Sequence, residues 1–551
     1  MGRKCKIKIE GSTSLFFVWV CVCFFLTLTI LFPLLCVLFT PKLSEVLSVL
    51  SSSVWKQAAL NTLLETLCST TLSVLIGYIY AYAVVKGDIP FTRFFSFIPL
   101  LHLVTPPFVG GLSFILLLGR QGFITKTLLG LDVSLYGFWG LLIAQSLCFF
   151  PMAYMILVQT LKGINPSLEK AALGLGASKT KVFMSITFPL SLSGILSAFL
   201  FVAVSVMSDF GNPMIVAGRF KVLAVEIYTQ LTGWVNKSAS IVLGLILVIP
   251  SVAIFLWQNK LNKNMNIATI GGRFGTFSNE ASSKSKSSQS KTSKKITFSK
   301  IFLTLFCSFI CLCVLAQFCA IIAGSFQELW GVNTSFTFRH FKNLTKWLKE
   351  LKNSVVFALS GAFLSTIIAT LASFLVYRTK APCKKYIDIT SQLPSAIPGS
   401  LFGLAISLAA ATLNYKQSAV LIIIAIAIGF MPFSYRIISS SFTQVRTTLD
   451  DGSSSLGSSK LQTLFYVLVP VLKGSIFNSF IYDFVRGVGT MSAVIFLVSF
   501  NTPLASIKIL NLAEQGFWGD AASLALVLTI ITFAVLGFAK LLLKVWGKNE
   551  K

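Results

Sequence analysis

The chain has 551 residues, of which 55% are hydrophobic and only 12% are charged, and its mean hydropathy is +0.82. This composition excludes a soluble globular protein and indicates many membrane-spanning helices, because a helix satisfies its own backbone hydrogen bonds in lipid. The formal net charge of +28 is interpreted as a topology signal, since Lys and Arg accumulate in cytoplasmic loops. We therefore expect the lipid bilayer as a partner and no nucleic acid.

Twelve apolar runs are each long enough to cross a bilayer, which takes about 20 mostly apolar residues in a helix. The first run exceeds the signal-peptide core of about 7 to 15 residues, so we expect it to remain as a membrane anchor. The sequence therefore predicts an all-α polytopic membrane protein with about twelve transmembrane helices. The runs lie near residues 15–39, 58–84, 94–118, 136–160, 186–207, 238–257, 300–325, 353–377, 390–411, 417–440, 467–498 and 520–545.

A polar segment at residues 258–299 separates the first six runs from the last six. It is rich in Ser and Lys and cannot bury enough apolar surface to fold, so we interpret it as a flexible cytoplasmic linker. A lysine run can also bind nucleic acid or anionic lipid, although such runs are more often simply solvated. We divide the chain into a first half at 1–257, the linker at 258–299 and a second half at 300–551.

The distribution of basic residues predicts the orientation in the membrane. A cytoplasmic N-terminus places most Lys and Arg on the cytoplasmic side, including those of the linker and of residues 540–551. The even number of spans then makes the C-terminus cytoplasmic as well. The basic stretch at 339–352 is the exception, because this topology places it outside.

One short pattern occurs twice, in polar breaks between apolar runs. Residues 169–189 read EKAALGLGASKTKVFMSITFP, and residues 450–470 read DDGSSSLGSSKLQTLFYVLVP. Gly457 minus Gly176 and Pro470 minus Pro189 both give 281, so the pattern recurs in one register. The repeat predicts two homologous halves, and the orientation above places both copies in the cytoplasm.

The repeated pattern resembles the EAA loop of the membrane subunits of binding-protein-dependent ABC importers. The first copy departs from that pattern at two positions. Lys170, one residue after Glu169, occupies the position that is acidic in the family, and Phe188 occupies the position that is Leu in the family. In the resembled family the loop inserts into a groove on the ATPase and transmits its motion. The residues that the resemblance assigns to ATPase coupling are Glu169, Ala171, Ala172, Gly176 and Pro189 in the loop at 166–189, and Asp450, Asp451, Gly457 and Pro470 in the loop at 447–470.

Local propensity predicts how each loop folds. Ala171 and Ala172 favour a short helix, Gly176 suits the turn that ends it because glycine tolerates a positive φ, and Pro189 is expected near the start of the next span. The second copy has Gly452 and Ser453 in place of the paired alanines. Since glycine inside a helix costs about 1 kcal/mol against alanine, we expect the first ATPase contact to be the better formed.

The resemblance implies a type I (MetI-like) permease with two homologous six-helix halves. It also implies a cytoplasmic ABC ATPase dimer and an extracytoplasmic substrate-binding protein as partners, with ATP and Mg²⁺ held by the ATPase and no cofactor held by this chain. Further segments resemble the fused permeases of ferric iron importers, which implies ferric iron as substrate. Similar permeases carry thiamine, polyamines, phosphonates or sulfate, and these remain alternatives. The segments are Asn61–Leu64, Pro106–Gly110, Asp209–Pro213 and, in the eleventh predicted span, Ser492–Leu497.

Ionisable side chains inside membrane spans are costly and by default indicate function. We predict that Glu65, Asp209, Asp483 and Arg486 line the translocation path. The alternative for Asp483 and Arg486, three residues apart on one helix face, is that they neutralise each other. The spans hold no carboxylate cluster that would favour Fe³⁺, and the eleven cysteines lack C-x-x-C spacing, so we expect no metal site.

Enzymatic activity is not expected of this chain. The segment at 174–180 comes nearest to a phosphate-binding loop but has the wrong spacing, so the energy must come from a partner. A secondary transporter would also have two six-helix halves but would not need an ATPase-docking loop. The sequence therefore predicts a multi-pass permease of the bacterial inner membrane, with both termini cytoplasmic, importing ferric iron that a periplasmic binding protein delivers.

Overall fold

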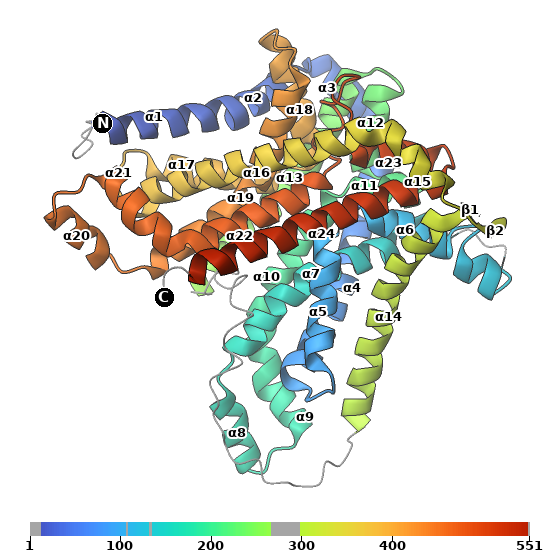
Figure 1. Cartoon of the computed structure of the whole chain (residues 1–551), viewed down its shortest axis with the longest axis horizontal. Coiled ribbons are helices and arrows are strands. Elements are labelled where there is room, and N and C mark those ends of the chain that lie inside the picture. The colour runs from blue at the N-terminus through green and yellow to red at the C-terminus, as the bar shows by residue number, and fades with distance from the viewer. Residues whose placement is uncertain (1–12, 106–107, 132–134, 266–297, 549–551) are drawn as a thin grey trace.

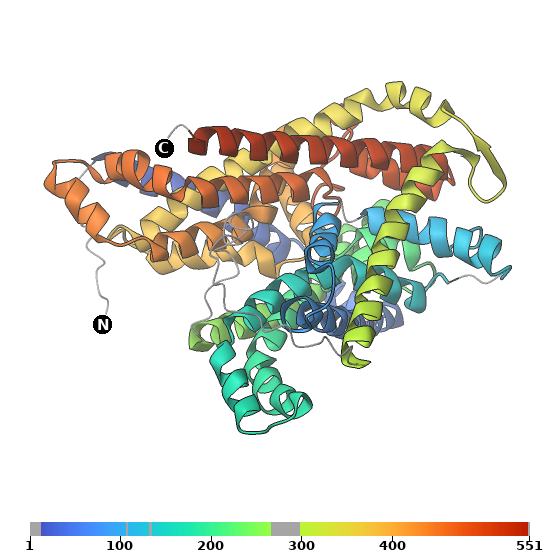
Figure 2. The ribbon, with the colours of Figure 1, turned by 60° about the horizontal axis from the view of Figure 1, so that its bottom comes forward.

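Two bundles of long helices, one from each half of the chain, make up the protein (Figures 1 and 2). The computed structural model describes residues 13–105, 108–131, 135–265 and 298–548. In the first bundle α4 packs against α7 and α10. The elements of this half are α1 (Thr13–Leu26), η1 (Thr27–Leu31), α2 (Phe32–Phe39), α3 (Leu43–Ser51), α4 (Ser53–Lys86), α5 (Thr92–Val104), α6 (Phe108–Leu118), η2 (Phe123–Leu128), α7 (Phe138–Gly163), α8 (Pro166–Gly174), α9 (Lys179–Val182), η3 (Phe183–Thr187), α10 (Phe188–Met207), α11 (Gly211–Val216), α12 (Leu223–Thr232) and α13 (Lys237–Met265).

The second bundle repeats this arrangement, with α16 packed against α19 and α22. Its only strands among the described residues form a short antiparallel hairpin. The elements of this half are α14 (Phe298–Phe326), β1 (Gln327–Leu329), β2 (Asn333–Phe336), α15 (Arg339–Asn343), η5 (Leu344–Trp347), α16 (Leu348–Tyr377), α17 (Lys384–Gln392), η6 (Leu393–Ala396), α18 (Gly399–Thr412), α19 (Ser418–Gln444), α20 (Thr448–Ser455), α21 (Lys460–Gln462), η7 (Thr463–Leu468), α22 (Val469–Val488), α23 (Ala505–Glu514) and α24 (Trp518–Lys548).

Ten helical segments of the described chain are long and apolar enough to cross a membrane, which confirms a polytopic all-α fold. Two of the twelve predicted spans are not single helices. The span predicted near 390–411 is bent by 116° between η6 and α18, where Pro394 and Pro398 lie. The span predicted near 94–118 is divided between α5 and α6, and the sequence has two prolines at 106 and 107 between them. Proline disfavours helix at the residue before it, which explains both interruptions.

Two further boundaries differ from the sequence prediction. The helix predicted over 467–498 begins at Lys460 and ends at Val488, so the segment Ser492–Leu497 forms turns after the helix and is not part of it. The predicted linker is shorter than expected at its start, because α13 continues to Met265. The Ser- and Lys-rich part of the linker lies outside the described residues.

Three prolines lie just inside helices that continue without a break. Pro33, Pro189 and Pro470 each follow a π-helical turn, formed by η1, η3 and η7 respectively. Proline cannot donate to the carbonyl four residues earlier, and a π turn accommodates this by moving the hydrogen bond one residue further along. The expectation that Pro189 lies near the start of its helix is confirmed, since Pro189 is the second residue of α10, and η3 and α9 continue the span back to Lys179.

The two halves are interlocked through their first helices. From the first half, α1 packs on α16 and α17, and α2 packs on α18. From the second half, α14 packs on α4, α5 and α6 (Figure 1). Each half therefore covers part of the other, and the two form one body.

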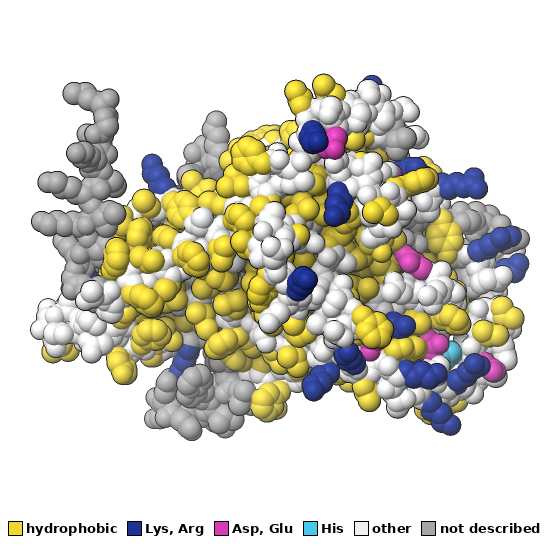
Figure 3. Space-filling view, turned by 90° about the horizontal axis from the view of Figure 1, so that it is seen from above, with side chains coloured by type: hydrophobic (Ala, Val, Ile, Leu, Met, Phe, Trp, Pro, Cys, Tyr) yellow, Lys and Arg dark blue, Asp and Glu magenta, His cyan; other side chains and the backbone are white. Residues whose placement is uncertain are grey.

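Figure 3 shows a broad apolar surface on this body, with basic side chains gathered at the right, the end that carries β1 and α15. Many exposed side chains on the long helices are large and apolar, for example Phe17, Phe24 and Leu63. Such a surface suits lipid, since apolar patches of this extent are rare on soluble monomers. The protein is therefore a multi-pass membrane protein.

Candidate functional site

The two repeated loops fold alike, each as a short helix, a glycine turn and a second helix that continues into the membrane. In the first loop Asn165 caps α8 by accepting a hydrogen bond from the Ser167 amide at 3.0 Å. Gly176 then turns the chain with φ of +86°, and Gly457 does so in the second loop with φ of +84°. The predicted positive φ at this glycine is confirmed, and it is the conformation that glycine adopts most readily.

An ion pair, partly buried in the first loop and nearly buried in the second, attaches each loop to the end of a long helix, α4 in the first half and α16 in the second. Lys86, at the end of α4, contacts Glu169 with a distance of 2.8 Å between Nζ and Oε2. Glu169 also accepts a hydrogen bond from Thr187 at 2.8 Å. Glu169, which stands one residue before the acidic position of the EAA pattern, is therefore the acid that holds α8 in place.

The second loop has the same attachment at the equivalent acid. Arg378, directly after α16, contacts Asp450 with 2.7 Å between Nη1 and Oδ2. The same guanidinium donates to the carbonyls of Phe442 and Val445, so it joins α20 to the end of α19. Asp450 minus Glu169 gives 281, the register of the repeat.

Gly452 does not prevent the second loop helix from forming. α20 has eight residues and α8 has nine, so the two are of similar length. The side chains of the second ion pair are also more buried, at 3% and 11% exposure against 15% and 19% in the first. The attachment of α20 offsets the low helix propensity of its sequence, and the inequality of the two ATPase contacts stays a prediction.

Each loop presents one exposed leucine at its turn, a feature that we did not predict from the sequence. Leu175 is 89% exposed and Leu456 is 88% exposed, and their numbers differ by 281. The helices behind them expose another equivalent pair, Leu168 and Leu449. The two loops therefore carry the same exposed apolar side chains at equivalent positions.

A cavity of about 260 Å³ lies between the two halves. The first half contributes α7, the end of α10, the loop after it, the start of α11 and α13, and the second half contributes η6, α18, α19, α22 and the turns after α22. Many of its lining residues are apolar. The polar and charged ones are Ser205, Ser208, Asp209, Gln258, Ser395, Arg436, Tyr482, Arg486, Thr490 and Ser492.

Two of the four predicted path residues, Asp209 and Arg486, line this cavity, and the other two do not. Glu65 is buried in the face of α4 that packs into the first bundle. Asp483 is also buried, and its Oδ2 accepts a hydrogen bond from Ser434 of α19 at 2.7 Å. Asp483 and Arg486, both within the described chain, form no ion pair with each other, so their mutual neutralisation is not observed.

The described part of the chain contains no group of three or more His, Cys, Asp or Glu side chains that could hold a metal ion. The ten cysteines in the described residues are all free thiols. No metal-binding arrangement of protein side chains therefore accompanies the cavity in these residues.

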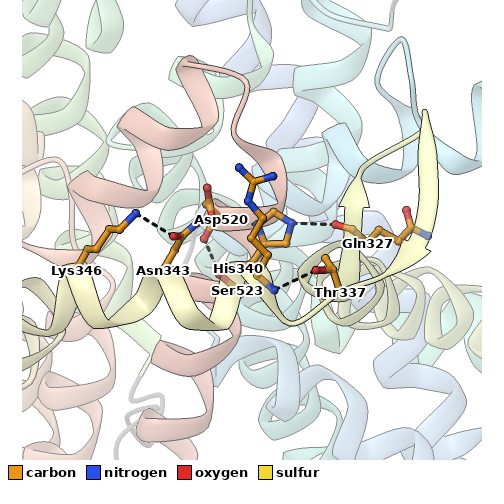
Figure 4. A network of polar contacts seen from close by, with 8 residues as sticks. Gln327, Thr337, His340, Asn343, Lys346, Asp520 and Ser523 are labelled. Carbon is orange, nitrogen blue, oxygen red and sulfur yellow. Dashed lines mark hydrogen bonds and ion pairs between the residues drawn. The ribbon is translucent and has the colours of Figure 1, made fainter.

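A polar network fixes the end of the molecule opposite α20 (Figure 4). His340 of α15 contacts Asp520 of α24 through Nδ1 and the Gln327 carbonyl of β1 through Nε2, both at 2.9 Å. Asn343 donates a further hydrogen bond to Asp520 at 3.1 Å. This network joins the hairpin, the start of the α16 segment and the start of α24.

The duplicated loops, each attached to a spanning helix, and the cavity between two interlocked helix bundles define a transport component. The chain belongs to the family of binding-protein-dependent transport system inner membrane components, whose model matches residues 73–267 and 361–544. Each match includes one of the two loops. This family consists of membrane components of transport systems and not of ATPases.

Three individual proteins of named transport systems are similar to this chain. The chain is 31% identical over 461 residues to the ferric transport system permease protein FbpB of Actinobacillus pleuropneumoniae, a match covering 81% of this chain and 65% of that relative. It is 29% identical over 525 residues to a Haemophilus influenzae protein provisionally named ferric transport system permease FbpB 1, covering 90% of this chain and 80% of the relative. The molybdenum transport system permease ModB of Escherichia coli is 27% identical over 224 residues, 39% of this chain and 97% of ModB.

Proposed function

We propose that this chain is the permease subunit of an ABC importer for ferric iron. Its family and the ferric transport names of two relatives support the proposal. In this proposal residues 1–257 and 300–551 are the two permease units of one transporter, and residues 258–299 connect them. The energy comes from ATP hydrolysis on a separate dimer of ATPase subunits, which hold ATP and Mg²⁺.

The observation that carries the proposal is the pair of loops with exposed Leu175 and Leu456 at their tips. Because each loop is ion-paired to the end of a long helix, a partner that moves the loop also moves α4 or α16. Those helices contain 34 and 30 residues, so at 1.5 Å per residue each extends over roughly 45 to 50 Å. Motion at the loops is thus carried across the hydrocarbon core, which is about 30 Å thick.

The same helix length supports an outward position for the basic stretch at 339–352. This stretch precedes and begins α16, and Arg378, the partner of coupling residue Asp450, follows the other end, so in this proposal the two lie on opposite sides of the membrane. With the loops and both termini in the cytoplasm, the basic stretch faces outside. Its exposed side chains favour an acidic surface on the substrate-binding protein. These side chains are Arg339, Lys342, Lys346, Lys349 and Lys352.

Reconstitution tests the proposal directly. The chain is placed in proteoliposomes with its ATPase inside and its iron-loaded binding protein outside, and uptake of radioactive iron is measured with and without ATP. We expect ATP-dependent uptake that disappears when the ATPase carries an inactivated catalytic site. Uptake of another substrate, with no iron uptake from a binding protein that holds iron, would overturn the substrate and leave the mechanism in place.

The path role of individual residues is tested in the same vesicles. We expect Arg486→Leu to reduce iron uptake, since Arg486 lines the cavity, and Asp209→Asn to do the same. Glu65→Gln and Asp483→Asn act through the packing of α4 and α22 and should affect protein stability more than uptake per folded molecule. Unchanged uptake in Asp209→Asn and Arg486→Leu would exclude both from the path.

A further inference from the structure

The cavity between the halves is unevenly charged. Its three formally charged lining residues are Asp209 from the first half and Arg436 and Arg486 from the second. Subtracting 281 places Met155 at the position equivalent to Arg436 and Ser205 at the position equivalent to Arg486. The two positive charges therefore have no counterpart in the first half.

The carboxylate of Asp209 is already bound by neutral groups of its own half. Its Oδ2 accepts hydrogen bonds from Gln145 at 3.0 Å and Asn212 at 2.8 Å, and Oδ1 faces the Asn212 amide at 3.5 Å. Within the described residues it forms no ion pair with either arginine. Asp209 is thus not a direct counter-ion of either arginine.

Each arginine has a buried nitrogen without a hydrogen-bond partner, Nη2 in Arg436 and Nε in Arg486. Arg436 also lies over the ring of Phe255 from α13, 5.9 Å from the centroid, which orients the guanidinium at the boundary between the halves. A buried guanidinium nitrogen without an acceptor is costly in a membrane interior. An anion in the cavity would supply the missing acceptors.

We propose, on the basis of the importer function above, that this cavity binds anionic oxygen ligands through Arg436 and Arg486. Guanidinium groups bind carboxylate and phosphate oxygens in a planar fork, which makes them suited to such ligands. A bare Fe³⁺ ion would be repelled by both arginines, whereas Fe³⁺ surrounded by negatively charged oxygen ligands would be attracted. Ferric iron therefore crosses this cavity as an anionic oxygen-ligand complex.

The same two arginines would also bind a free tetrahedral oxyanion. The experiment must therefore distinguish a free oxyanion from oxygen ligands that surround Fe³⁺. The full chain, assembled with its ATPase in lipid nanodiscs, is titrated with radiolabelled inorganic phosphate. We expect saturable binding that Arg436→Gln and Arg486→Gln each weaken at least tenfold. Lys416→Gln removes one positive charge from the exposed loop between α18 and α19 and serves as the matched control, with unchanged binding.

A second pair of variants keeps the test valid if the Gln variants do not fold. Arg436→Lys and Arg486→Lys keep the charge but lose the planar fork, and we expect binding between the wild-type and Gln levels. Folding is checked by monodisperse elution of the assembled complex. Wild-type affinity in both Lys and both Gln variants would overturn the role of the arginines.

Uptake in proteoliposomes then distinguishes the inference from the function on which it rests. Parallel losses of phosphate binding and iron uptake in the arginine variants support the inference. Arginine-dependent phosphate uptake without iron uptake supports the anion site and overturns iron as the substrate. Normal iron uptake by both Gln variants, with no phosphate binding by the wild type, overturns the anion site and leaves the importer function standing.

Discussion

The ammonium of Lys86 lies 2.8 Å from a carboxylate oxygen of Glu169, which ties the end of α4 to the loop helix α8. Arg378 and Asp450 form the equivalent contact at 2.7 Å in the second half. An Arg thus replaces a Lys and an Asp replaces a Glu, while the contact itself is retained in both halves. Both halves therefore attach the loop helix to a long helix in the same way.

We expect the second ion pair to matter more for stability than the first. Arg378 and Asp450 are nearly buried, and removing one partner of a buried pair costs about 3–5 kcal/mol because it leaves the other charge unpaired. The first pair is somewhat more exposed and should be worth less, toward the roughly 1 kcal/mol of surface pairs. Thermal unfolding in detergent should therefore show a larger decrease in Tm for Asp450→Asn than for Glu169→Gln.

A double-mutant cycle provides the control for this comparison. Arg378→Gln combined with Asp450→Asn should cost less than the sum of the two single changes, because neither charge is then left alone. Strictly additive effects, or a larger effect at Glu169, would show that the contact in the second half does not stabilise the loop.

The long helices and the duplication could be predicted from the sequence because both are local signals. Apolar runs identify spans one at a time, and the register of 281 needs only the two copies of one pattern. The ion pairs could not be predicted, since Lys86 and Glu169 are 83 residues apart and meet only through the packing of α4 on α7. Pro394 and Pro398 are helix-breaking residues, but they lie within a continuous apolar run, so a single span without a bend was predicted there.

Three residues of the proposed sites could have been found in the sequence but were not predicted. Arg436 lies inside the predicted span 417–440, so the rule that singled out Arg486 applies to it equally. Leu175 and Leu456 occupy the same position in the two copies of the repeat, since their numbers differ by 281, so the pair could have been identified from the repeat alone. Their exposure depends on how the glycine turn orients the residue before it, which only the folded loop shows.

The exposed leucines should contribute to ATPase binding. We expect Leu175→Asp and Leu456→Asp each to weaken association with the ATPase by tenfold or more, because a charge replaces an apolar side chain at the contact. Co-purification and binding of the isolated ATPase to the chain in nanodiscs measure this. Leu129→Asp changes another exposed leucine in a loop far from α8 and α20 and should leave binding unchanged. Full ATPase affinity in the double variant Leu175→Asp/Leu456→Asp would refute the contact.

Two kinds of glycine should respond differently to alanine. Nothing lies within 4 Å of a Cβ added at Gly176 or Gly457, so the cost is only that of a positive φ, roughly 1–2 kcal/mol. A Cβ at Gly403 in α18 would overlap the carbonyl oxygen of Ala493, and backbone cannot move aside cheaply. We expect Gly403→Ala to reduce the yield of folded protein severely, with Gly176→Ala folding but coupling less well. Equal yields of the two variants would contradict this packing.

The His340 network should stabilise the end of the protein that carries β1 and α15. Both ring nitrogens face acceptors, the Asp520 carboxylate and the Gln327 carbonyl, so replacing His340 removes two hydrogen bonds that link three elements. His340→Phe keeps a ring of similar size in the buried position but removes both contacts, and Asp520 then keeps only the Asn343 donor; a buried polar group left unsatisfied costs about 1–3 kcal/mol. Arg339→Gln changes an exposed neighbour and is the control. Thermal unfolding in detergent should show a lower Tm for His340→Phe alone, and equal Tm values for the two variants would mean that the network does not stabilise this end.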